Sequence, residues 1–372
     1  MELSIIGFAN SGKTTLFNAI TGSTIEVSPN ITTDTKPVSK LVNVPDSRVD
    51  YLSTLFKPLK TTYTTIRCTD FIGITKGDTK KNRMVLNLIK DSDAIVNVVR
   101  AFESEGVIHP LESVDYFRDI LLFESEMILM DLELVENRIV RIEEGEKKGK
   151  KGNPEERAIL DKCYKILSQE RPLREIEFSE EELMNMRHLQ FASIKPQLIV
   201  INVDESTPEP ERREMEERVE REFIKGRKNL EVITLSAKVE SEISLLSPEE
   251  RRLFLREMGI ERPAFEKVIE SSYKLLGLIS FLTVGEDEVR AWTIKRGSNA
   301  QQAAGQIHSE IAKGLIRAEV VSYDDFKKTI EELGGRLPSN YMEVLKSKNR
   351  LRLEPKEYIV KNGDIINFRH AK

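Results

Sequence analysis

Residues 7–14 read Gly-Phe-Ala-Asn-Ser-Gly-Lys-Thr, which is a complete G-x-x-x-x-G-K-[ST] phosphate-binding loop. In such a loop, backbone N–H groups and the N-terminus of the following helix surround phosphate oxygens. The ammonium of Lys13 could reach the β- and γ-phosphates of a nucleotide, and the hydroxyl of Thr14 suits Mg²⁺. Lys13 is therefore also a candidate catalytic residue. The residues predicted to bind nucleotide in this loop are Asn10, Ser11, Gly12, Lys13, Thr14 and Thr15.

The elements that must position this loop lie directly on either side of it. Residues 3–6 form a short apolar run suited to a buried strand, and residues 14–20 have the apolar face of a helix. A chance glycine-rich turn is a poor alternative, because both neighbouring elements are in the right order. Strand, loop and helix N-terminus together predict a phosphate cradle.

A second signal, Asp70-Phe71-Ile72-Gly73, ends a β-rich run over residues 64–70. At the end of such a strand, the Asp70 carboxylate can hold Mg²⁺, directly or through water, and the N–H of Gly73 can face the γ-phosphate. Between the two motifs, the polar residues 31–35 offer a threonine that could complete the Mg²⁺ shell, although an ordinary hydroxyl-rich loop is also possible there. The preferred candidate is Thr33, with Thr32 and Thr35 as alternatives.

The base-reading motif departs from the guanine-specific pattern. The apolar run 196–201 is followed by Asn202-Val203-Asp204-Glu205, where guanine-specific P-loop proteins carry N-K-x-D. Val203 replaces the lysine, and Glu205 replaces the aspartate that accepts from guanine N1–H and N2–H₂, so we expect adenine to be preferred. After the short strand 232–234, three further residues are predicted to line the base pocket: Ser236, Ala237 and Lys238.

The water-positioning group is harder to find. Many switch NTPases place a glutamine directly after D-x-x-G, but this chain has Ile74 there, which cannot orient water. His109, in a loop that ends at Pro110, could swing toward the γ-phosphate as a base or positioner, although an ordinary surface histidine is an open alternative. Asn10 stands where some related NTPases coordinate K⁺, so cation assistance is a further possibility. These residues predict a site that binds nucleotide well and hydrolyses it slowly.

Composition narrows the class of protein. The chain has 372 residues, a formal net charge of −5 and two cysteines, Cys68 and Cys163. Nucleic-acid contact would therefore need a local basic patch, and the cysteine count predicts no disulfide framework. No apolar run approaches the roughly 18 residues that span a bilayer, and the N-terminus lacks a signal pattern. We expect a cytoplasmic protein without a membrane segment.

A long helical insertion interrupts the nucleotide motifs. Apolar residues recur at spacings of three and four from Tyr116 to Leu134, a second amphipathic helix follows Asn153-Pro154, and a capping box begins at Ser179. These features predict an antiparallel hairpin of two helices. Its tip carries four lysines that could be a solvated surface or a nucleic-acid contact: Lys147, Lys148, Lys150 and Lys151.

From about Gly277 the pattern changes to short β-rich pieces with one clear helix. The predicted strands are 281–284, 291–295, 318–322, 358–360 and 364–368, and the predicted helix is 300–311. This alternation is typical of a small ubiquitin-like α+β module. Fold alone does not determine its partner.

The motifs and most of the chain resemble the Obg-like ATPase family, the YchF group of translation-factor-class P-loop NTPases. The resemblance is carried by residues 7–22, 44–46, 93–95, 98–103, 202–205, 288–294, 307–308 and 314–320. It implies an α/β P-loop NTPase domain with an inserted antiparallel helical hairpin and a C-terminal ubiquitin-like α+β domain, similar to TGS domains. It also implies ATP preference over GTP, slow hydrolysis and association with the ribosome and its rRNA. Two departures are Ala9 in place of the usual proline and the short segment after Gly73.

The predicted domains are a first NTPase part at 1–110, the hairpin at 111–194, a second NTPase part at 195–277 and the TGS-like domain at 278–372. The function favoured is a nucleotide-dependent switch that binds and slowly hydrolyses ATP with Mg²⁺. Two alternatives stay open: a guanine-nucleotide-specific Obg-type GTPase, and an interaction module that binds nucleotide with negligible turnover.

Overall fold

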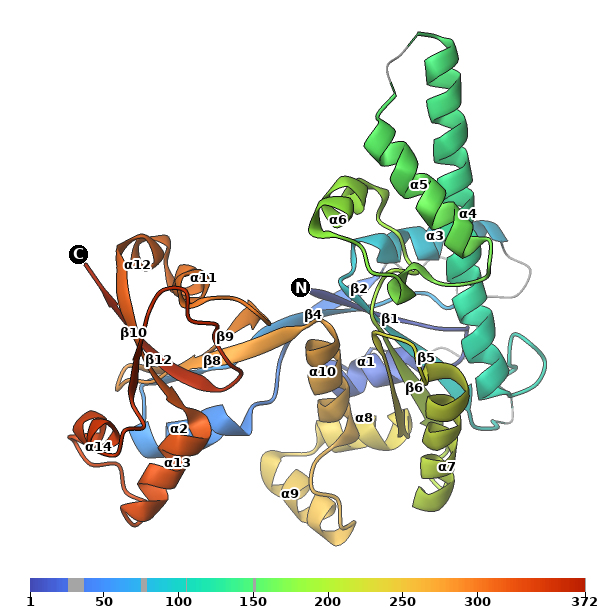
Figure 1. Cartoon of the computed structure of the whole chain (residues 1–372). Coiled ribbons are helices and arrows are strands. Elements are labelled where there is room, and N and C mark those ends of the chain that lie inside the picture. Colours follow the sequence, from blue (N-terminus) through green and yellow to red (C-terminus); the bar gives the residue numbers. More distant parts are fainter. Residues whose placement is uncertain (26–36, 75–78, 105, 150–151, 372) are drawn as a thin grey trace. The chain divides into compact units, whose positions relative to one another are not determined.

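A computed structural model describes residues 1–25, 37–74, 79–104, 106–149 and 152–371. The chain divides into two compact units, each assembled from two stretches of sequence (Figure 1). Unit 1 contains Met1–Val42 and Arg67–Leu275, and unit 2 contains Asn43–Ile66 and Leu276–Lys372. This grouping differs from the division expected from sequence, which includes residues 43–66 in the first NTPase part.

Unit 1 is built on a six-stranded sheet in the order β2-β4-β1-β5-β6-β7. The central strands are parallel to their neighbours, and β5 and β6 are almost entirely buried. Their mainly apolar sequences are typical of parallel strands that are covered on both faces. The strands are β1 (Glu2–Ile6), β2 (Val38–Asn43), β4 (Thr65–Asp70), β5 (Ala94–Ala101), β6 (Gln197–Val203) and β7 (Leu230–Leu235).

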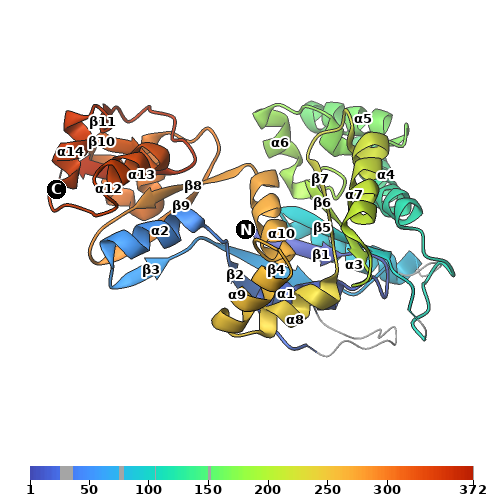
Figure 2. The same ribbon diagram turned by 90° about the horizontal axis from the view of Figure 1, so that it is seen from below.

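Helices cover both faces of this sheet (Figure 2). On one face, α3 (Thr79–Leu88), α4 (Tyr116–Lys147) and α7 (Glu209–Val219) pack on the apolar side chains of β5 and β6. On the other face, α1 (Lys13–Thr21) packs against α8 (Ala237–Leu245) and α10 (Ala264–Leu275). Unit 1 also contains α9 (Pro248–Glu257), the 3₁₀ turn η1 (Ile89–Asp91) and the π-helical turn η4 (Glu220–Ile224).

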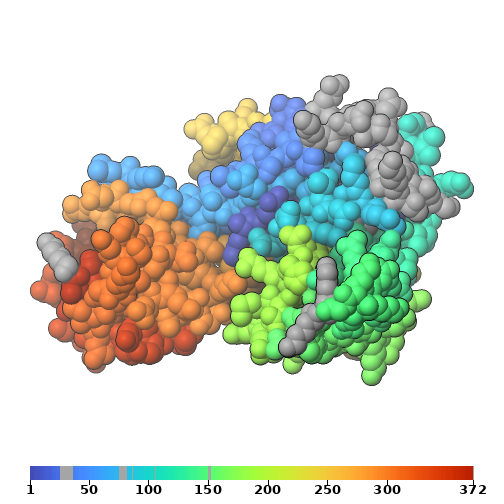
Figure 3. Space-filling model, turned by 90° about the horizontal axis from the view of Figure 1, so that it is seen from above, coloured from blue at the N-terminus to red at the C-terminus, as the bar shows by residue number. Residues whose placement is uncertain are grey.

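The predicted helical hairpin is present. Helix α4 pairs with α5 (Pro154–Leu167), which begins at an Asn153 cap with Pro154 in its first turn. The hairpin has its own apolar core, to which α6 (Glu180–Met186) contributes through its buried Met186. In the space-filling view, the hairpin and the residues of α6 form a continuous surface (Figure 3). The short turns η2 (Leu173–Glu175) and η3 (Arg187–Leu189) complete this region.

A buried carboxylate fixes the return of the chain from the hairpin to the sheet. Asp131 of α4 is fully buried and accepts hydrogen bonds from the backbone N–H groups of Ala192 (2.9 Å) and Ser193 (2.7 Å). Nearby, Glu124 of α4 pairs with Arg174 at 2.5 Å. Because buried charges are costly unless they are paired and hydrogen-bonded, these contacts hold the base of α4 in one position.

Unit 2 is a second six-stranded sheet, in the order β11-β10-β12-β8-β9-β3, with helices on both faces. Helices α11 and α12 pack on one face, and α2, α13 and α14 pack on the other. Its strands are β3 (Lys60–Thr62), β8 (Leu278–Thr283), β9 (Glu288–Lys295), β10 (Leu315–Ser322), β11 (Arg352–Glu354) and β12 (Asp364–His370). Its helices are α2 (Ser47–Phe56), α11 (Ala300–Ile307), α12 (Ser309–Gly314), α13 (Tyr323–Glu332) and α14 (Tyr341–Ser347).

Two predictions for unit 2 were wrong in detail. The helix expected over 300–311 is broken at His308, whose backbone is extended (φ −162°, ψ 140°). The His308 imidazole accepts from the N–H of Glu310, so His308 ends α11 and caps α12. The strand expected at 358–360 is reduced to an isolated bridge between Ile359 and Asn299. The pairing cannot continue because Asn299 caps α11, which begins at the next residue.

Two compositional predictions can be compared with the structure. Among the described residues, every helix is too short or too polar to cross a membrane. Cys68 and Cys163 are both buried free thiols. Burial raises the pKa of each thiol to about 12.

Candidate nucleotide-binding site

The phosphate-binding loop connects β1 to α1, as its sequence predicts. Gly12 precedes the first residue of α1 and has φ +93°, in the left-handed region. A Cβ at this position would lie 2.1 Å from Nδ2 of Asn202, so both conformation and space require glycine there. The loop is thus closely packed against the strand that carries the base-reading motif.

Lys13 lies at the centre of the loop. Its side chain is nearly buried, and Nζ donates a hydrogen bond to the carbonyl of Phe8 at 2.7 Å. A Cβ on Gly73 would be 2.8 Å from the same Nζ, so the D-x-x-G glycine lies directly beside the ammonium. The structure therefore brings together the two groups that sequence assigned to the β- and γ-phosphates.

Thr14 and Asp70 also meet. The Thr14 hydroxyl donates to Oδ2 of Asp70 at 2.7 Å, while Oδ1 of Asp70 is buried without a partner among the described residues. Burial raises the pKa of Asp70, whereas the Thr14 hydrogen bond and the Lys13 charge oppose that shift. An unpaired buried carboxylate oxygen beside a hydroxyl is a donor set that suits a hard divalent cation. P-loop NTPases generally use Mg²⁺ in this position.

The segment after Gly73 is bound to the phosphate loop. The N–H of Ile74 donates to the carbonyl of Gly7 (3.0 Å), and the N–H of Ala9 donates to the carbonyl of Ile74 (2.8 Å). The Ile74 side chain is 1% exposed and packs in an apolar cluster with Phe8 and Phe71. It therefore points into the protein, where it cannot contact a water molecule in the site.

Asn202 links the phosphate loop to the base-reading side. Its Nδ2 donates to the carbonyl of Ser11, and its Oδ1 accepts from the N–H of Ala237, both at 2.9 Å. Ser236 lies beside this contact with a buried hydroxyl, and neither that Oγ nor the Oγ of Ser11 has a partner within the described part of the chain. Ser11 and Ser236 therefore stay predicted nucleotide-binding residues.

The other residues predicted to contact the base differ in burial. Val203 ends β6 with its side chain in the apolar cluster under α7, so only its backbone can reach a ligand. Glu205 and Lys238 are exposed and form an ion pair at 2.9 Å. Thr15 lies half-buried in the first turn of α1. Thr33, with its alternatives Thr32 and Thr35, lies outside the described residues, as do Lys150 and Lys151.

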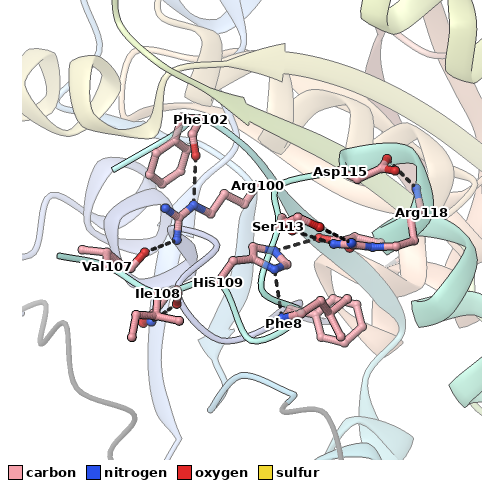
Figure 4. A network of polar contacts seen from close by, with 12 residues as sticks. Phe8, Arg100, Phe102, Val107, Ile108, His109, Ser113, Asp115 and Arg118 are labelled. Carbon is pink, nitrogen blue, oxygen red and sulfur yellow. Dashed lines mark hydrogen bonds and ion pairs between the residues drawn. The ribbon is translucent and has the colours of Figure 1, made fainter. Parts of the chain in front are cut away.

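His109 is not in an open loop. Its side chain is 2% exposed. Nδ1 accepts a hydrogen bond from the N–H of Leu111 at 3.1 Å, and Nε2 lies 2.9 Å from Oδ2 of Asp119 in α4 (Figure 4). Burial lowers the pKa of His109, and the Asp119 carboxylate opposes that shift. The preceding residue, Ile108, accepts a hydrogen bond through its carbonyl from Nδ2 of Asn10 (3.1 Å). The histidine loop is therefore tied to the phosphate loop.

Comparison with known proteins agrees with this geometry. Residues 2–130 match the family model MMR_HSR1, described as a 50S ribosome-binding GTPase, and residues 278–371 match YchF-GTPase_C, described as a protein of unknown function. "Ribosome-binding ATPase YchF" of Bacillus subtilis is 41% identical over 99% of this chain and 99% of its own length. The Escherichia coli O157:H7 protein of the same name is 37% identical, covering 99% of this chain and 98% of its own. The chain belongs to the YchF family.

A solved structure extends the agreement to the fold of the whole YchF chain. The Schizosaccharomyces pombe YchF GTPase matches with a TM-score of 0.77 and 28% identity, covering 99% of this chain and 97% of that one. The resemblance inferred from sequence is thus confirmed, as is the mixed α/β fold with a P-loop GTPase-like domain and a C-terminal domain. The site residues stay predictions.

Sequence reasoning missed two residues around the histidine of this YchF protein. Arg100 at the end of β5 is buried, and its guanidinium donates to the carbonyls of Phe102 and Val107, both at 3.0 Å. Asp119 lies in the first turn of α4 and pairs with His109. A charged residue on a mainly apolar strand was a usable signal for the first. The position of Asp119 among the apolar residues of a helix seam was a weaker signal for the second.

Proposed function

We propose that this protein is a nucleotide-dependent switch that binds and slowly hydrolyses ATP with Mg²⁺ and associates with the ribosome in the cytoplasm. The observation that carries the nucleotide part is the convergence of Lys13, the Thr14–Asp70 pair and Gly73 around one loop. The ribosome part is supported by the relatives named "Ribosome-binding ATPase YchF".

Thr14 and Asp70 are the proposed Mg²⁺ ligands, with Thr33 as the predicted third. When bound, Mg²⁺ would neutralise negative charge on the β- and γ-phosphates. Lys13 would exchange its hydrogen bond to Phe8 for phosphate oxygens, which are stronger acceptors because they are charged. Asn10 stays the proposed K⁺ ligand. Its backbone is in the left-handed region (φ +61°), and its side-chain amide donates a hydrogen bond to the carbonyl of Ile108 in the histidine loop.

Adenine preference is supported by the base-side geometry. The Val203 side chain is buried, so it cannot replace the lysine of a guanine-specific motif. The Glu205 carboxylate is already paired with Lys238, which competes with the two hydrogen bonds that guanine would offer. The solved relative is titled a GTPase and the curated ones ATPases, so GTP is the alternative substrate to compare.

Slow turnover is supported by the position of Ile74, which is buried where a water-positioning glutamine would otherwise stand. We propose that His109 supplies the missing function after leaving its buried position, orienting the attacking water or accepting its proton. A nucleotide-binding module with negligible turnover is the second candidate, because the structure holds His109 in a buried pair.

The proposed ribosome contacts are the hairpin and the C-terminal module. Lys147 and Lys148 are exposed at the end of α4 and could meet RNA phosphates. Such contacts release counterions, so affinity should fall steeply with added salt. Co-sedimentation with ribosomal subunits at low and high salt, with ATP or ADP, tests this part. Absence of association at low salt in both nucleotide states would refute it.

Side-by-side titrations with ATP and GTP test the nucleotide part. Lys13→Ala should lose tight triphosphate binding while retaining the fold, since each charge-assisted contact contributes about 1.5–3 kcal/mol. Unchanged ATP affinity in the folded variant would refute the phosphate-loop assignment, and GTP binding at least tenfold tighter than ATP binding would refute the adenine preference. Single-turnover hydrolysis of ATP separates an ATPase from a module without turnover.

A further inference from the structure

Both ring nitrogens of His109 are engaged in the structure. Nδ1 accepts from the N–H of Leu111, so it carries no proton, and in the neutral ring the proton must be on Nε2. Nε2 faces Oδ2 of Asp119 at 2.9 Å, a short contact whose direction is poorly aligned for a hydrogen bond. Neither nitrogen is free to bind a water molecule. His109 can act on water only if at least one of these two contacts is given up.

The loop around His109 reverses the usual preference of its side chains. His109 is 4% exposed, whereas the neighbouring Ile108 is 80% exposed. Histidine is intermediate in its tendency to be buried, whereas isoleucine is among the residues most often buried. Three residues further on, Glu112 has φ +68°, which is uncommon for a residue with a Cβ. A rearranged loop that exposes His109 and buries Ile108 would relieve the unfavourable placement of these two side chains.

Asp119 opposes that rearrangement. Its side chain is 1% exposed, and Oδ1 accepts from Nε (3.0 Å) and Nη2 (2.8 Å) of Arg118, while Oδ2 faces His109. Arg118 is in turn fixed by Ser113, to whose Oγ and carbonyl it donates. The carboxylate is therefore held rigidly at the start of α4. A rigidly held partner retains the imidazole more strongly than a mobile one would.

The same loop is attached to both the phosphate loop and the hairpin helix. Asn10 of the phosphate loop binds the carbonyl of Ile108, and Asp119 of α4 binds the ring of His109 (Figure 4). Helix α4 continues without interruption from Tyr116 to Lys147 at the hairpin tip. A displacement of α4 would act directly on the contact with His109, since that contact lies in the first turn of the helix.

We propose that Asp119 is a positioning residue that stores His109 in a buried, inactive position, so that hydrolysis waits until α4 releases the imidazole. This inference rests on the proposed role of His109 in hydrolysis. The released imidazole would contact the attacking water, and the hairpin helix α4 would control that release through Asp119. The resting protein then hydrolyses slowly for two reasons: Ile74 cannot position water, and His109 is held elsewhere.

The test uses the full-length protein, MgATP and no partner. Asp119→Asn keeps the size of the side chain but removes its charge, and it should raise kcat by at least about fivefold with KM changed by less than about twofold, because couplings between sites are commonly of that size. Asp115→Asn is the matched control: it makes the same change four residues earlier, at the exposed cap of α4, and it should leave kcat unchanged. Equal effects of the two substitutions would overturn the proposal.

A double variant shows whether Asp119 acts through His109. Asp119→Asn combined with His109→Ala should hydrolyse ATP as slowly as His109→Ala alone. A persistent rate increase in the double variant, or an unchanged or lower kcat in Asp119→Asn, would overturn the storage role. His109→Ala alone should be slower than wild type, because the slow wild-type turnover comes from the small fraction of molecules in which the imidazole is released. A wild-type rate in His109→Ala would mean that the proposed role of His109 itself fails, which is a distinct result.

Arg118→Lys provides a second variant in case Asp119→Asn does not fold. It leaves the Asp119 charge in place but removes the two-nitrogen contact that fixes the carboxylate, so kcat should rise by a smaller factor than in Asp119→Asn. Far-UV circular dichroism checks the fold of each variant. An unchanged kcat in a folded Arg118→Lys protein would count against the proposal that a rigidly held Asp119 retains His109.

Discussion

Gly12→Ala should damage the site through two separable effects. The first is conformational: alanine at φ +93° is strained, at a cost of about 1–2 kcal/mol. The second is steric, because the new Cβ would lie 2.1 Å from Nδ2 of Asn202. Asn202 would have to move, and its hydrogen bonds to Ser11 and Ala237 would be lost. Each buried group left unpaired costs about 1–3 kcal/mol, so the two lost contacts add about 2–6 kcal/mol, and we expect a total loss of about 3–8 kcal/mol of stability.

Two companion variants separate these effects. Gly22→Ala is the matched control, since Gly22 ends the same helix at φ +58° and a Cβ added there would meet nothing within 4 Å among the described residues, so it should cost only the conformational part. Gly12→Ala added to Asn202→Ala should also cost only about 1–2 kcal/mol, because the obstructing side chain is gone. The two substitutions at Gly12 and Asn202 should therefore be strongly non-additive.

Urea unfolding followed by far-UV circular dichroism measures these stabilities, and titration with a fluorescent ATP analogue measures the site. The chain's single tryptophan, Trp292, lies in unit 2, so its fluorescence reports on the other unit and not on this loop. The reasoning would be refuted by additive costs in the double variant, or by a Gly12→Ala protein no less stable than Gly22→Ala.

Three further results are expected. The first concerns Glu205→Asp without any change at the buried Val203. It should shift the difference in binding free energy between ATP and GTP toward GTP by less than about 3 kcal/mol. An unchanged affinity ratio in competition assays would show that Glu205 does not contact the base. Burial raises the pKa of the Glu240 carboxyl above its ordinary value of 4.5, although the hydrogen bond that it accepts from the N–H of Phe265 opposes that shift. The stability that the protonated carboxyl contributes is therefore complete in acid and is lost as pH rises through the raised pKa. Glu240→Gln should gain stability relative to wild type as pH rises from about 4.5, and parallel stability–pH curves would contradict this. Cys68 and Cys163, with thiol pKa values of about 12, should react with a disulfide reagent only on unfolding, and rapid labelling of the native protein would contradict their burial.

The nucleotide motifs could be predicted from sequence because their chemistry is local. Gly12, Lys13 and Thr14 are adjacent, and strand, loop and helix follow each other without a gap. The contact between Thr14 and Asp70 was also within reach, since both motifs end neighbouring parallel strands of one sheet. Parallel strands place their C-terminal ends at the same edge, so consecutive motifs converge there.

Tertiary contacts explain what sequence could not give. Extending β6 by two residues beyond the predicted end places Val203 in the apolar cluster and Asn202 on the opposite face, because side chains alternate along a strand. The burial of His109 depends on Asp119, ten residues later on a separate helix, and no local pattern reveals that pairing. Likewise, the break at His308 depends on a side-chain cap that competes with continued helix.

Residues 43–66 have a consequence for how the chain is made. Val49 and Leu52 of α2 are fully buried in a cluster with Leu282, Phe326 and Ile365 of unit 2. During synthesis at about 5–20 residues per second, α2 must wait about 15–60 s for the last of these partners to be made. Until those partners are made, the apolar face of α2 is not fully covered, and it lies between two nucleotide-binding motifs of the nascent chain. A product truncated near residue 277 would keep that helix uncovered permanently, so we expect it to aggregate or to be captured by chaperones instead of behaving as an isolated NTPase domain.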